Sequence, residues 1–433
     1  MTAREHIAGY ESKVREYTNF ATRGIKNVIK ACGPRECGSE AERKAQEMMA
    51  KELENVCDSV TLESFKTAPH AFLGWVNLAF WTFFGAAIAF FFGYALISLV
   101  LLLAILAVIV LEFLMYKEAL DVIYPKKQSQ NVVGIRKPEG EVKRRLVLCG
   151  HADSAYEWHY TYWGDKYFGT VKLLVAVIAL GVCILFVGIA FSIAALAKEG
   201  LFSGVWTLGE RYGAMQVLSY IFCALCVPLA SVLFFKSWKH LVDGANDNLS
   251  GCFTAMAVAK LLGDQKLRLK NTELVVVCSG GEECGLRGAK AFAKAHAAEY
   301  TDVETAFISL DTMRDFEHMT IYHRDMTGTV KLDDAVCALV RAGGKTAGYD
   351  LPYSIVFFGS SDGAAAQQAG IRTAAFAAMD PAPAAYYHTR LDTADNLDPK
   401  TLEASIDIML EVTYQFDTTG LAPFEGAVVK TGG

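Results

Sequence analysis

The chain of 433 residues is apolar for its length, with 53% hydrophobic residues, 20% charged residues and a mean hydropathy of +0.26. Soluble globular proteins are less apolar than this, so we expect part of the chain to face lipid. A formal net charge of −6 gives no basic surface field and excludes nucleic acid as an expected partner. The 11 cysteines form no disulfide framework or CxxC pattern, which favours reduced buried thiols and a reducing compartment.

The polar, helix-like segment 1–71 opens the chain and has no signal-peptide pattern. The apolar segment 72–116 follows, and its only charged residue is Glu112 near its end. A spanning helix needs about 20 residues, so this length predicts two helices with a tight turn at Gly93 and Tyr94.

A second apolar segment, 168–236, divides in the same way. Its uncharged runs 173–197 and 215–235 are separated by a polar loop. The sequence therefore predicts four transmembrane helices in two hairpins, with core helices of a large soluble protein as the alternative.

Charged residues beside the predicted spans indicate an orientation. The hairpin tips carry no net charge, whereas lysines gather at the opposite ends, namely Lys66, Lys117, Lys126, Lys127, Lys166, Lys172, Lys236 and Lys239. Positive residues near span ends stay on the cytoplasmic side. We therefore expect a multi-pass protein of the cell membrane whose polar segments 1–71, 117–167 and 237–433 form one discontinuous domain on the cytoplasmic side.

Strands and helices alternate outside the predicted spans. Short apolar runs predict strands at 131–136, 145–150, 273–278, 305–310, 353–358 and 372–376. A turn at 137–140 predicts that the first two form a hairpin. Helical patterns lie at 287–298, 331–342 and 402–416. The alternation predicts an α/β fold with a mixed, largely parallel sheet covered by helices, whose ligands bind beyond the carboxyl ends of the strands.

Two candidate metal-binding motifs border the second apolar segment. His151 and Asp153 directly follow the strand 145–150, where an imidazole can bind a metal while a carboxylate fixes its orientation. This pair alone is a weak signal, because short patterns recur by chance. Asp247 opens a helix of small residues, and a lone aspartate there is more often a helix cap.

Three further motifs follow at strand ends and in a late loop. Glu282 and Glu283 lie in a glycine-rich loop, where glycines let the backbone bring carboxylates close to an ion. Glu283 suits a metal ligand and Glu282 a general base. Asp311 ends the strand 305–310, and His388 follows Tyr387 in the segment Tyr-Tyr-His-Thr-Arg. Taken singly, Asp311 and His388 would more often be satisfied polar groups than ligands.

Taken in order, the motifs His-x-Asp, Asn-Asp-Asn with Ser-Gly, Gly-Glu-Glu, Leu-Asp and Tyr-His-Thr resemble the two-zinc aminopeptidase family of metallopeptidase clan MH. That family includes bacterial leucyl aminopeptidase, aminopeptidase Y and glutamate carboxypeptidase. The resemblance covers about 33–66, then 131–157 and about 245–416, and it leaves out the predicted spans. The family's His-x-Asp and bridging aspartate usually lie close together, whereas here 94 positions separate Asp153 from Asp247.

The resemblance implies zinc exopeptidase chemistry and a ligand set. His151, Asp247 and Asp311 would hold one zinc ion. Asp247 would bridge to a second zinc ion, which Glu283 and His388 would also bind. Two divalent ions are balanced in charge by three carboxylates and one hydroxide. Imidazole and carboxylate ligands without thiolate suit zinc, with cobalt or manganese as substitutes.

The resemblance also implies roles around the metals. Glu282 would be the general base and then the general acid. Asp153 would orient His151, and Asp392 would do the same for His388. Tyr387 would either donate to the oxyanion or simply pack beside the ligand that follows it.

The sequence thus predicts a cytoplasm-facing zinc aminopeptidase that removes N-terminal residues from peptides. Gly363 stands where many relatives have histidine after Ser-Asp, which leaves the substrate preference open. The alternatives are a glutaminyl-cyclase-like acyltransferase, which needs one tightly held zinc, and a non-catalytic membrane receptor or scaffold. The intact ligand set argues against both. Expected partners are a peptide substrate and the lipid bilayer; the oligomeric state, a homo-oligomer included, stays open.

Overall fold

The computed structural model describes residues 2–164, 169–199, 214–382 and 384–431, and it divides into two compact units. Unit 1 consists of Met1–Pro69, Lys126–Glu157 and Lys239–Gly433. Unit 2 consists of His70–Pro125 and Trp158–Trp238. The chain therefore leaves unit 1 twice and returns to it twice.

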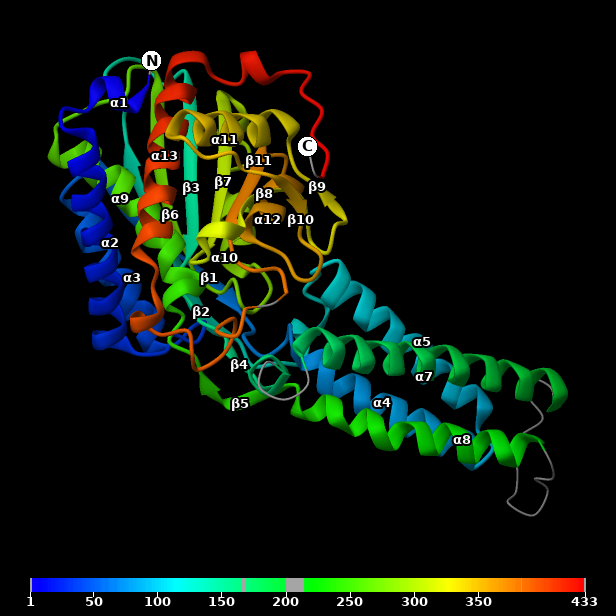
Figure 1. Ribbon diagram of the computed structural model, residues 1–433. Coiled ribbons are helices and arrows are strands. Elements are labelled where there is room, and N and C mark those ends of the chain that lie inside the picture. Colours follow the sequence, from blue (N-terminus) through cyan, green and yellow to red (C-terminus); the bar gives the residue numbers. More distant parts are fainter. Residues whose placement is uncertain (1, 165–168, 200–213, 383, 432–433) are drawn as a thin grey trace. The chain divides into compact units, whose positions relative to one another are not determined.

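Within the described residues, unit 1 is built on a nine-stranded sheet (Figure 1). Its strands are β1 (Ser59–Thr67), β2 (Lys127–Arg136), β3 (Arg144–His151), β6 (Thr272–Ser279), β7 (Glu304–Met313), β8 (Met319–Asp325), β9 (Val330–Lys331), β10 (Tyr353–Ile355) and β11 (Thr373–Ala378). Their order is β1-β2-β6-β3-β7-β11-β8-β10, with β9 beside β8. Because β6, β3, β7 and β11 are parallel, their carboxyl ends lie at one edge of the sheet. A small separate sheet pairs β4 (Tyr156–Trp158) with β5 (Lys236–Leu241).

Helices cover both faces of the large sheet. One face packs against α2 (Tyr10–Cys32), α3 (Glu40–Glu54), α9 (Ser250–Asp264), α11 (Asp334–Ala347) and α13 (Pro399–Thr419), with the short α1 (Ala3–His6) beside them, and the other face packs against α10 (Arg287–His296) and α12 (Asp362–Gln368). Along β3, Leu146 and Leu148 belong to the first core, whereas Val147 and Cys149 belong to the second. Successive side chains of a strand point to opposite faces, so β3 contributes to both cores. The predicted mixed, largely parallel, helix-covered sheet is confirmed.

One predicted feature of the sheet is wrong. The strands β2 and β3 do not form a hairpin, because β6 lies between them, antiparallel to β2 and parallel to β3. Every residue of β6 is buried. An apolar strand of this kind requires neighbours on both sides and cover on both faces. Burial of β6 between β2 and β3 is therefore favoured over the hairpin that the turn at 137–140 predicted.

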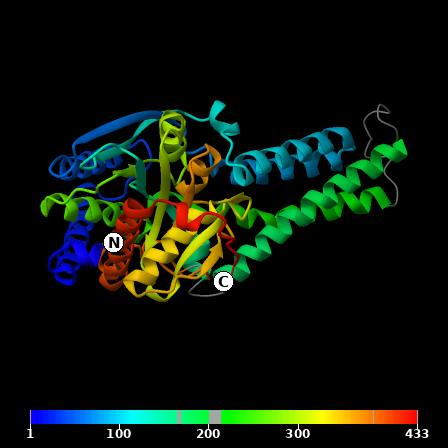
Figure 2. The same ribbon diagram turned by 90° about the horizontal axis from the view of Figure 1, so that it is seen from above.

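Unit 2 is a bundle of apolar helices that run side by side in both views (Figures 1 and 2). Its long helices are α4 (Gly74–Phe91), α5 (Ala95–Val108), α7 (Thr170–Glu199) and α8 (Ala214–Leu229), with the short α6 (His159–Trp163) before α7. In the described part of the chain, four segments are long and apolar enough to cross a membrane: Gly74–Phe91, Ala95–Leu114, Val175–Lys198 and Gln216–Phe234. The four apolar helices predicted from the sequence are therefore present. Residues 168 and 200–213 of the predicted second hairpin lie outside the described residues.

Candidate metal centre

The predicted metal ligands meet at the carboxyl edge of the parallel strands. His151 is the last residue of β3, and Asp311 lies near the end of β7. Asp247 lies in the loop before α9, Glu283 follows β6, and His388 lies between β11 and α13. The chain thus brings together five side chains from five segments, although their roles as ligands stay predictions.

The five side chains form two overlapping groups. Ligand atoms of His151, Asp247 and Asp311 lie within 4.8 Å of one another. Those of Asp247, Glu283 and His388 meet the same limit. A third combination, His151 with both Glu282 and Glu283, does so as well, which places Glu282 against the first two groups. Asp247 is the carboxylate that the first two groups share.

The two carboxylate oxygens of Asp247 face different histidines. Its Oδ1 is 3.1 Å from Nε2 of His151, and its Oδ2 is 3.0 Å from Nε2 of His388. Glu283 Oε1 is 3.3 Å from the same His388 nitrogen. Asp247 Oδ2 and Glu283 Oε1 are buried, and apart from these contacts with His388 no described residue donates a hydrogen bond to either atom. Buried acceptors without a partner are costly, so these atoms fit a site that a cation completes.

The pKa values of these side chains have shifts expected of a cluster that needs positive charge. Burial alone would lower the pKa of His388, but the carboxylates of Glu283 and Asp247 raise it to about 10. Burial and the charge of Asp247 raise the pKa of Asp311 to about 7. The buried carboxylates therefore hold protons on their neighbours, and divalent cations would supply that charge instead. A donor set of imidazole and carboxylate groups fits zinc.

Asp153 is fully buried and joins His151 to the glycine-rich loop. Its Oδ1 lies 3.5 Å from Nδ1 of His151, the ring nitrogen that does not face Asp247. The same carboxylate accepts hydrogen bonds from the backbone N–H groups of Glu282 (3.0 Å) and Glu283 (3.1 Å). Asp153 therefore contacts both the ring and the loop, whereas the sequence indicated only its contact with the ring.

Glu282 and Tyr387 lie against the ligand groups. Glu282 Oε2 is 3.8 Å from Nε2 of His151. Burial raises the pKa of Glu282 well above its ordinary value, and the charge of Glu283 adds to the shift. The ring of Tyr387 stacks on His388 with a centroid distance of 4.0 Å. Burial and the nearby carboxylates raise the pKa of the Tyr387 hydroxyl, so it stays protonated and can donate a hydrogen bond.

Two side chains fix the loop that carries Asp247. Asn248 donates from Nδ2 to the carbonyl oxygen of Leu310 (2.8 Å), which precedes Asp311 in β7. Asp392 accepts hydrogen bonds from the backbone N–H groups of Asn246 (2.8 Å) and Asp247 (3.1 Å). Asp392 therefore holds the shared ligand's loop, and its expected role toward His388 stays a prediction.

Glu42 is a site residue that sequence reasoning missed. It is buried at the start of α3 and accepts hydrogen bonds from the backbone N–H of Gly281 (3.1 Å) and the hydroxyl of Ser129 (2.9 Å). Gly281 has a φ of +63°, which favours glycine, and it directly precedes Glu282. The Ser-x-x-Glu pattern ending at Glu42 indicates only a helix start, so it gave no sign of this contact.

Gly363 is buried at the start of α12, against the sheet. A Cβ atom added there would lie 3.1 Å from Cγ2 of Thr373 in β11 and 3.3 Å from Cβ of Ser309 in β7. Both separations are tight, so a larger side chain at this position would require its neighbours to move.

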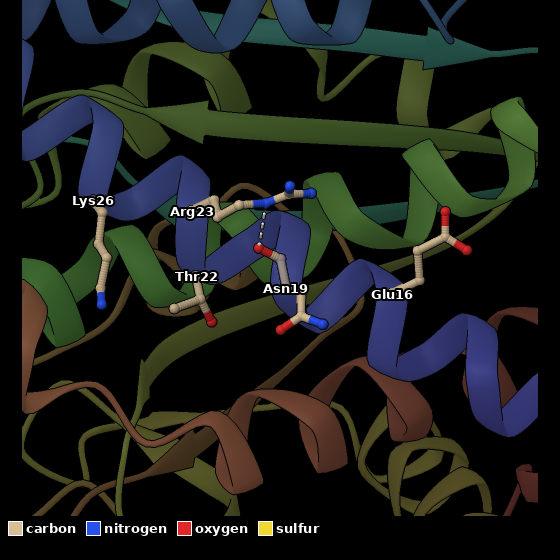
Figure 3. A pocket seen from close by; sticks show the side chains of 5 residues that line it. All are labelled: Glu16, Asn19, Thr22, Arg23 and Lys26. Carbon is tan, nitrogen blue, oxygen red and sulfur yellow. Dashed lines mark hydrogen bonds between the residues drawn. The ribbon is translucent and has the colours of Figure 1, made fainter.

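Two surface hollows of unit 1 differ in their relation to these residues. The larger, of about 690 Å³, lies beside the loop that carries His388 and is lined by Arg314, Asp315, His318, Asp380, Ala384, Ala385, Tyr386, Arg390, Leu391, Thr393, Asp395 and Asn396. The smaller, of about 350 Å³, is lined by Glu16, Asn19, Thr22, Arg23 and Lys26, which all belong to α2 (Figure 3). Neither hollow is lined by a predicted metal ligand, by Glu282 or by Tyr387.

Part of the chain is similar to a known peptidase family. Residues 231–413 match the model of peptidase family M28. The match includes Asp247, Glu283, Asp311 and His388, and it begins after His151. It covers less than half of the chain, and it agrees with the resemblance that the motifs predicted. No curated protein matches the chain.

Several solved structures share the fold. The aminopeptidase from Aneurinibacillus sp. strain AM-1 is 14% identical, with 94% of this chain and 95% of that chain covered and a TM-score of 0.53. BSAP, a zinc aminopeptidase from Bacillus subtilis, is 14% identical, with 92% and 95% covered and a TM-score of 0.53. The glutaminyl cyclase of Bacteroides thetaiotaomicron is 16% identical, with 92% and 97% covered and a TM-score of 0.51. Identities this low establish a common fold alone.

Proposed function

We propose that this chain is a membrane-anchored aminopeptidase with two zinc ions. The observation that carries the proposal is the pair of ligand groups that share Asp247. His151 and Asp311 complete one group, and Glu283 and His388 complete the other. A carboxylate that two groups share can hold two metal ions close together, as a two-metal hydrolase requires.

The residues around the ligands supply the proton transfers. Zinc bound here would polarise the scissile carbonyl and lower the pKa of a water molecule at the site. Glu282 removes a proton from the attacking water and passes it to the leaving amine. The carboxylate of Asp153 accepts a hydrogen bond from the backbone N–H of Glu282 and so holds Glu282 in place. The hydroxyl of Tyr387 donates to the oxyanion that develops on the scissile carbonyl.

Glutaminyl cyclase activity is the second candidate, because glutaminyl cyclases appear among the structures that share the fold. A cyclase of this kind needs one tightly held zinc, so the metal count separates the two functions. The group of His151, Asp247 and Asp311 is the feature that favours hydrolysis.

The membrane anchor and the orientation belong to the same proposal. Four apolar segments of sufficient length support the anchor. Lysines such as Lys117 and Lys239 lie in the sequence where these apolar segments continue into unit 1, and they favour a cytoplasmic location for unit 1. We expect protease to cleave unit 1 in inside-out vesicles and to spare it in intact cells. Cleavage of unit 1 in intact cells would contradict the cytoplasmic location and place unit 1 outside the cell.

The activity is tested on the full-length protein in detergent. Metal content by mass spectrometry is expected to be two zinc ions per chain, and a panel of aminoacyl reporters is expected to show amine release. Glu282→Gln should keep both ions and lose about 10²- to 10⁴-fold in kcat. Glu299→Gln, at a largely exposed carboxylate, is the control and should behave as wild type.

Other outcomes of this experiment identify the alternatives. One zinc ion per chain with cyclisation of N-terminal glutamine would indicate a cyclase. A protein without zinc or turnover would indicate a receptor or scaffold. Full hydrolysis by Glu282→Gln with its metals intact would contradict the role of Glu282.

A further inference from the structure

Arg35 lies between two segments of unit 1 that carry predicted metal ligands. One segment precedes the residues Trp158–Trp238 of unit 2 in the chain, and the other follows them. Its side chain is fully buried. Nε donates to the carbonyl oxygen of Ala152 at 2.7 Å. Nη1 and Nη2 donate to those of Asp243 (2.7 Å) and Gly244 (3.0 Å). A further bond from Nη1 reaches the carbonyl oxygen of Gly33 at 3.1 Å, which ties the guanidinium to its own segment.

The backbone around Arg35 is fitted to this side chain. Arg35 N–H donates to Oγ of Ser154 at 2.9 Å, and the N–H of Ser154 donates to the carbonyl oxygen of Arg35 at 2.9 Å. Gly244 has a φ of +58°, and a Cβ atom there would lie 3.0 Å from Nη2 of Arg35. The guanidinium therefore occupies a closely shaped space between the segments.

A buried guanidinium is costly unless its donors are satisfied. Arg35 satisfies four of its five N–H donors with backbone carbonyl groups. Burial lowers the pKa of Arg35, and the negative charges of Asp153 and Asp392 oppose this shift. These two carboxylates are the groups that hold the Glu282 loop and the Asp247 loop. The cation therefore lies near both of the carboxylates that support the ligands.

We propose that Arg35 is a positioning residue that keeps His151 and Asp247 within reach of a shared metal centre. Ala152 directly follows His151, and Gly244 shortly precedes Asp247. Between these segments the chain runs through Trp158–Trp238 of unit 2. A long intervening segment raises the entropic cost of bringing its ends together, and Arg35 offsets that cost by hydrogen bonds to both ends. The inference rests on the proposed two-zinc function.

The test measures zinc affinity by chelator competition in the full-length protein. Arg35→Met removes all four side-chain hydrogen bonds at similar volume, and Arg35→Lys keeps the charge without the planar fork. Loss of a group that orients metal ligands costs about 10- to 100-fold in affinity, and we expect a loss in that range for Arg35→Met. Both zinc ions should weaken, because Asp247 belongs to both groups. Arg35→Lys should lie between Arg35→Met and wild type.

Arg145 offers a matched control, because it lies at the opposite end of β3 from His151. It is buried near the start of β3 and pairs with Glu273 at 2.7 Å. Arg145→Met should lower the unfolding temperature and leave zinc affinity unchanged. Unchanged affinity in Arg35→Met, or an equal loss in both variants, would overturn the inference.

A milder variant covers the case in which Arg35→Met fails to fold. Ser154→Ala removes only the hydroxyl that accepts from the Arg35 backbone, and it should weaken zinc binding by less than Arg35→Lys. Wild-type affinity in both Ser154→Ala and Arg35→Lys would overturn the inference. A wild-type protein that binds no zinc would instead overturn the proposed function on which the inference rests.

Discussion

Helix α9 of unit 1 and helix α7 of unit 2 are both apolar, yet they meet different surroundings. In α9 nearly every residue is buried against the sheet and its neighbouring helices. In the span Val175–Lys198 of α7, only 22% of the apolar stretch is buried inside the structure, and Phe186 is 65% exposed. Exposed apolar surface of this extent is typical of segments that contact a membrane or another protein. Apolar composition alone therefore does not tell a helix buried in a core from one with an exposed apolar surface.

The two units also differ in the polar groups that they bury. Unit 1 buries many charged side chains and joins them to one another, as around Asp153 and Asp247. In unit 2 the buried polar contacts between helices include a hydrogen bond of 3.1 Å from the hydroxyl of Ser192 to that of Ser98. Buried charge requires partners, and unit 1 supplies them from segments on both sides of each insertion. The side chains of the candidate metal centre therefore meet although the chain of unit 1 is interrupted twice.

Asp247→Ala should have the largest effect, because it removes the carboxylate that both ligand groups share. We expect loss of both zinc ions and of turnover, by more than the roughly 100-fold that an outer partner contributes. Asp264→Ala is the control at the other end of α9, where the carboxylate pairs with Lys260 on the surface. Metal analysis and reporter hydrolysis check both variants. Retention of one tightly bound zinc in Asp247→Ala would show that the groups are independent.

Leu103→Arg tests whether the surface of unit 2 faces lipid. Leu103 lies near the middle of the apolar span Ala95–Leu114 and is 48% exposed. An arginine at the centre of a spanning helix costs about 2.5 to 3.5 kcal/mol, whereas a surface substitution in water costs within about 0.5 kcal/mol. The variant should therefore insert poorly and yield little membrane-bound protein. Leu62→Arg, on the exposed edge of β1 in unit 1, is the control and should accumulate normally; equal yields would indicate that α5 faces water.

The sequence predicted which side chains lie close together at the candidate centre better than it predicted the pairing of the sheet. His151, Asp247 and His388 are far apart in the chain, and their residue types and motif context were enough to group them. The position of β6 between β2 and β3 was missed, because a strand's own pattern does not specify which strand it pairs with.

Contacts made through the backbone were missed for a related reason. Arg35 donates to carbonyl groups, which every residue has, so its partners leave no mark on the sequence. The edge strand β1 was missed because it is partly exposed and mixes polar with apolar residues. Its pairing with β2 is a long-range contact that residues 59–67 alone do not reveal.

Removal of zinc should lower the stability of unit 1 and leave that of unit 2 unchanged. Zinc that binds only the folded state stabilises it by about 2.7 kcal/mol when free zinc is 100-fold above the Kd. A chelator should therefore lower the unfolding midpoint of unit 1, followed by near-ultraviolet circular dichroism, and leave the helix content of unit 2 unchanged. Added zinc should restore the midpoint. Asp247→Ala should not respond to the chelator, and an equal response in that variant would show that the stabilising metal binds elsewhere.

The smallest expected effect concerns His296 in α10, which lies 2.9 Å from Glu63 of β1 and 3.2 Å from Glu299. The hydrogen bond to Glu63 raises the pKa of His296 above its usual 6.5, although burial opposes the shift. Its contribution to stability is therefore complete below about pH 6.5 and is lost as the pH rises through the raised value. For a pair this close to the surface we expect at most about 1 kcal/mol.

His296→Gln should remove this part of the pH dependence from the unfolding midpoint of unit 1, measured on both sides of neutral pH. Glu63→Gln should remove most of it, because Glu63 is the main cause of the shift. Glu299→Gln should remove less, since its side chain is 57% exposed and its charge is better screened. The helices of unit 2 carry few titratable groups, so their unfolding should not follow the same pH profile. A slope that survives in both His296→Gln and Glu63→Gln would contradict this assignment and show that other titratable groups of unit 1 carry it.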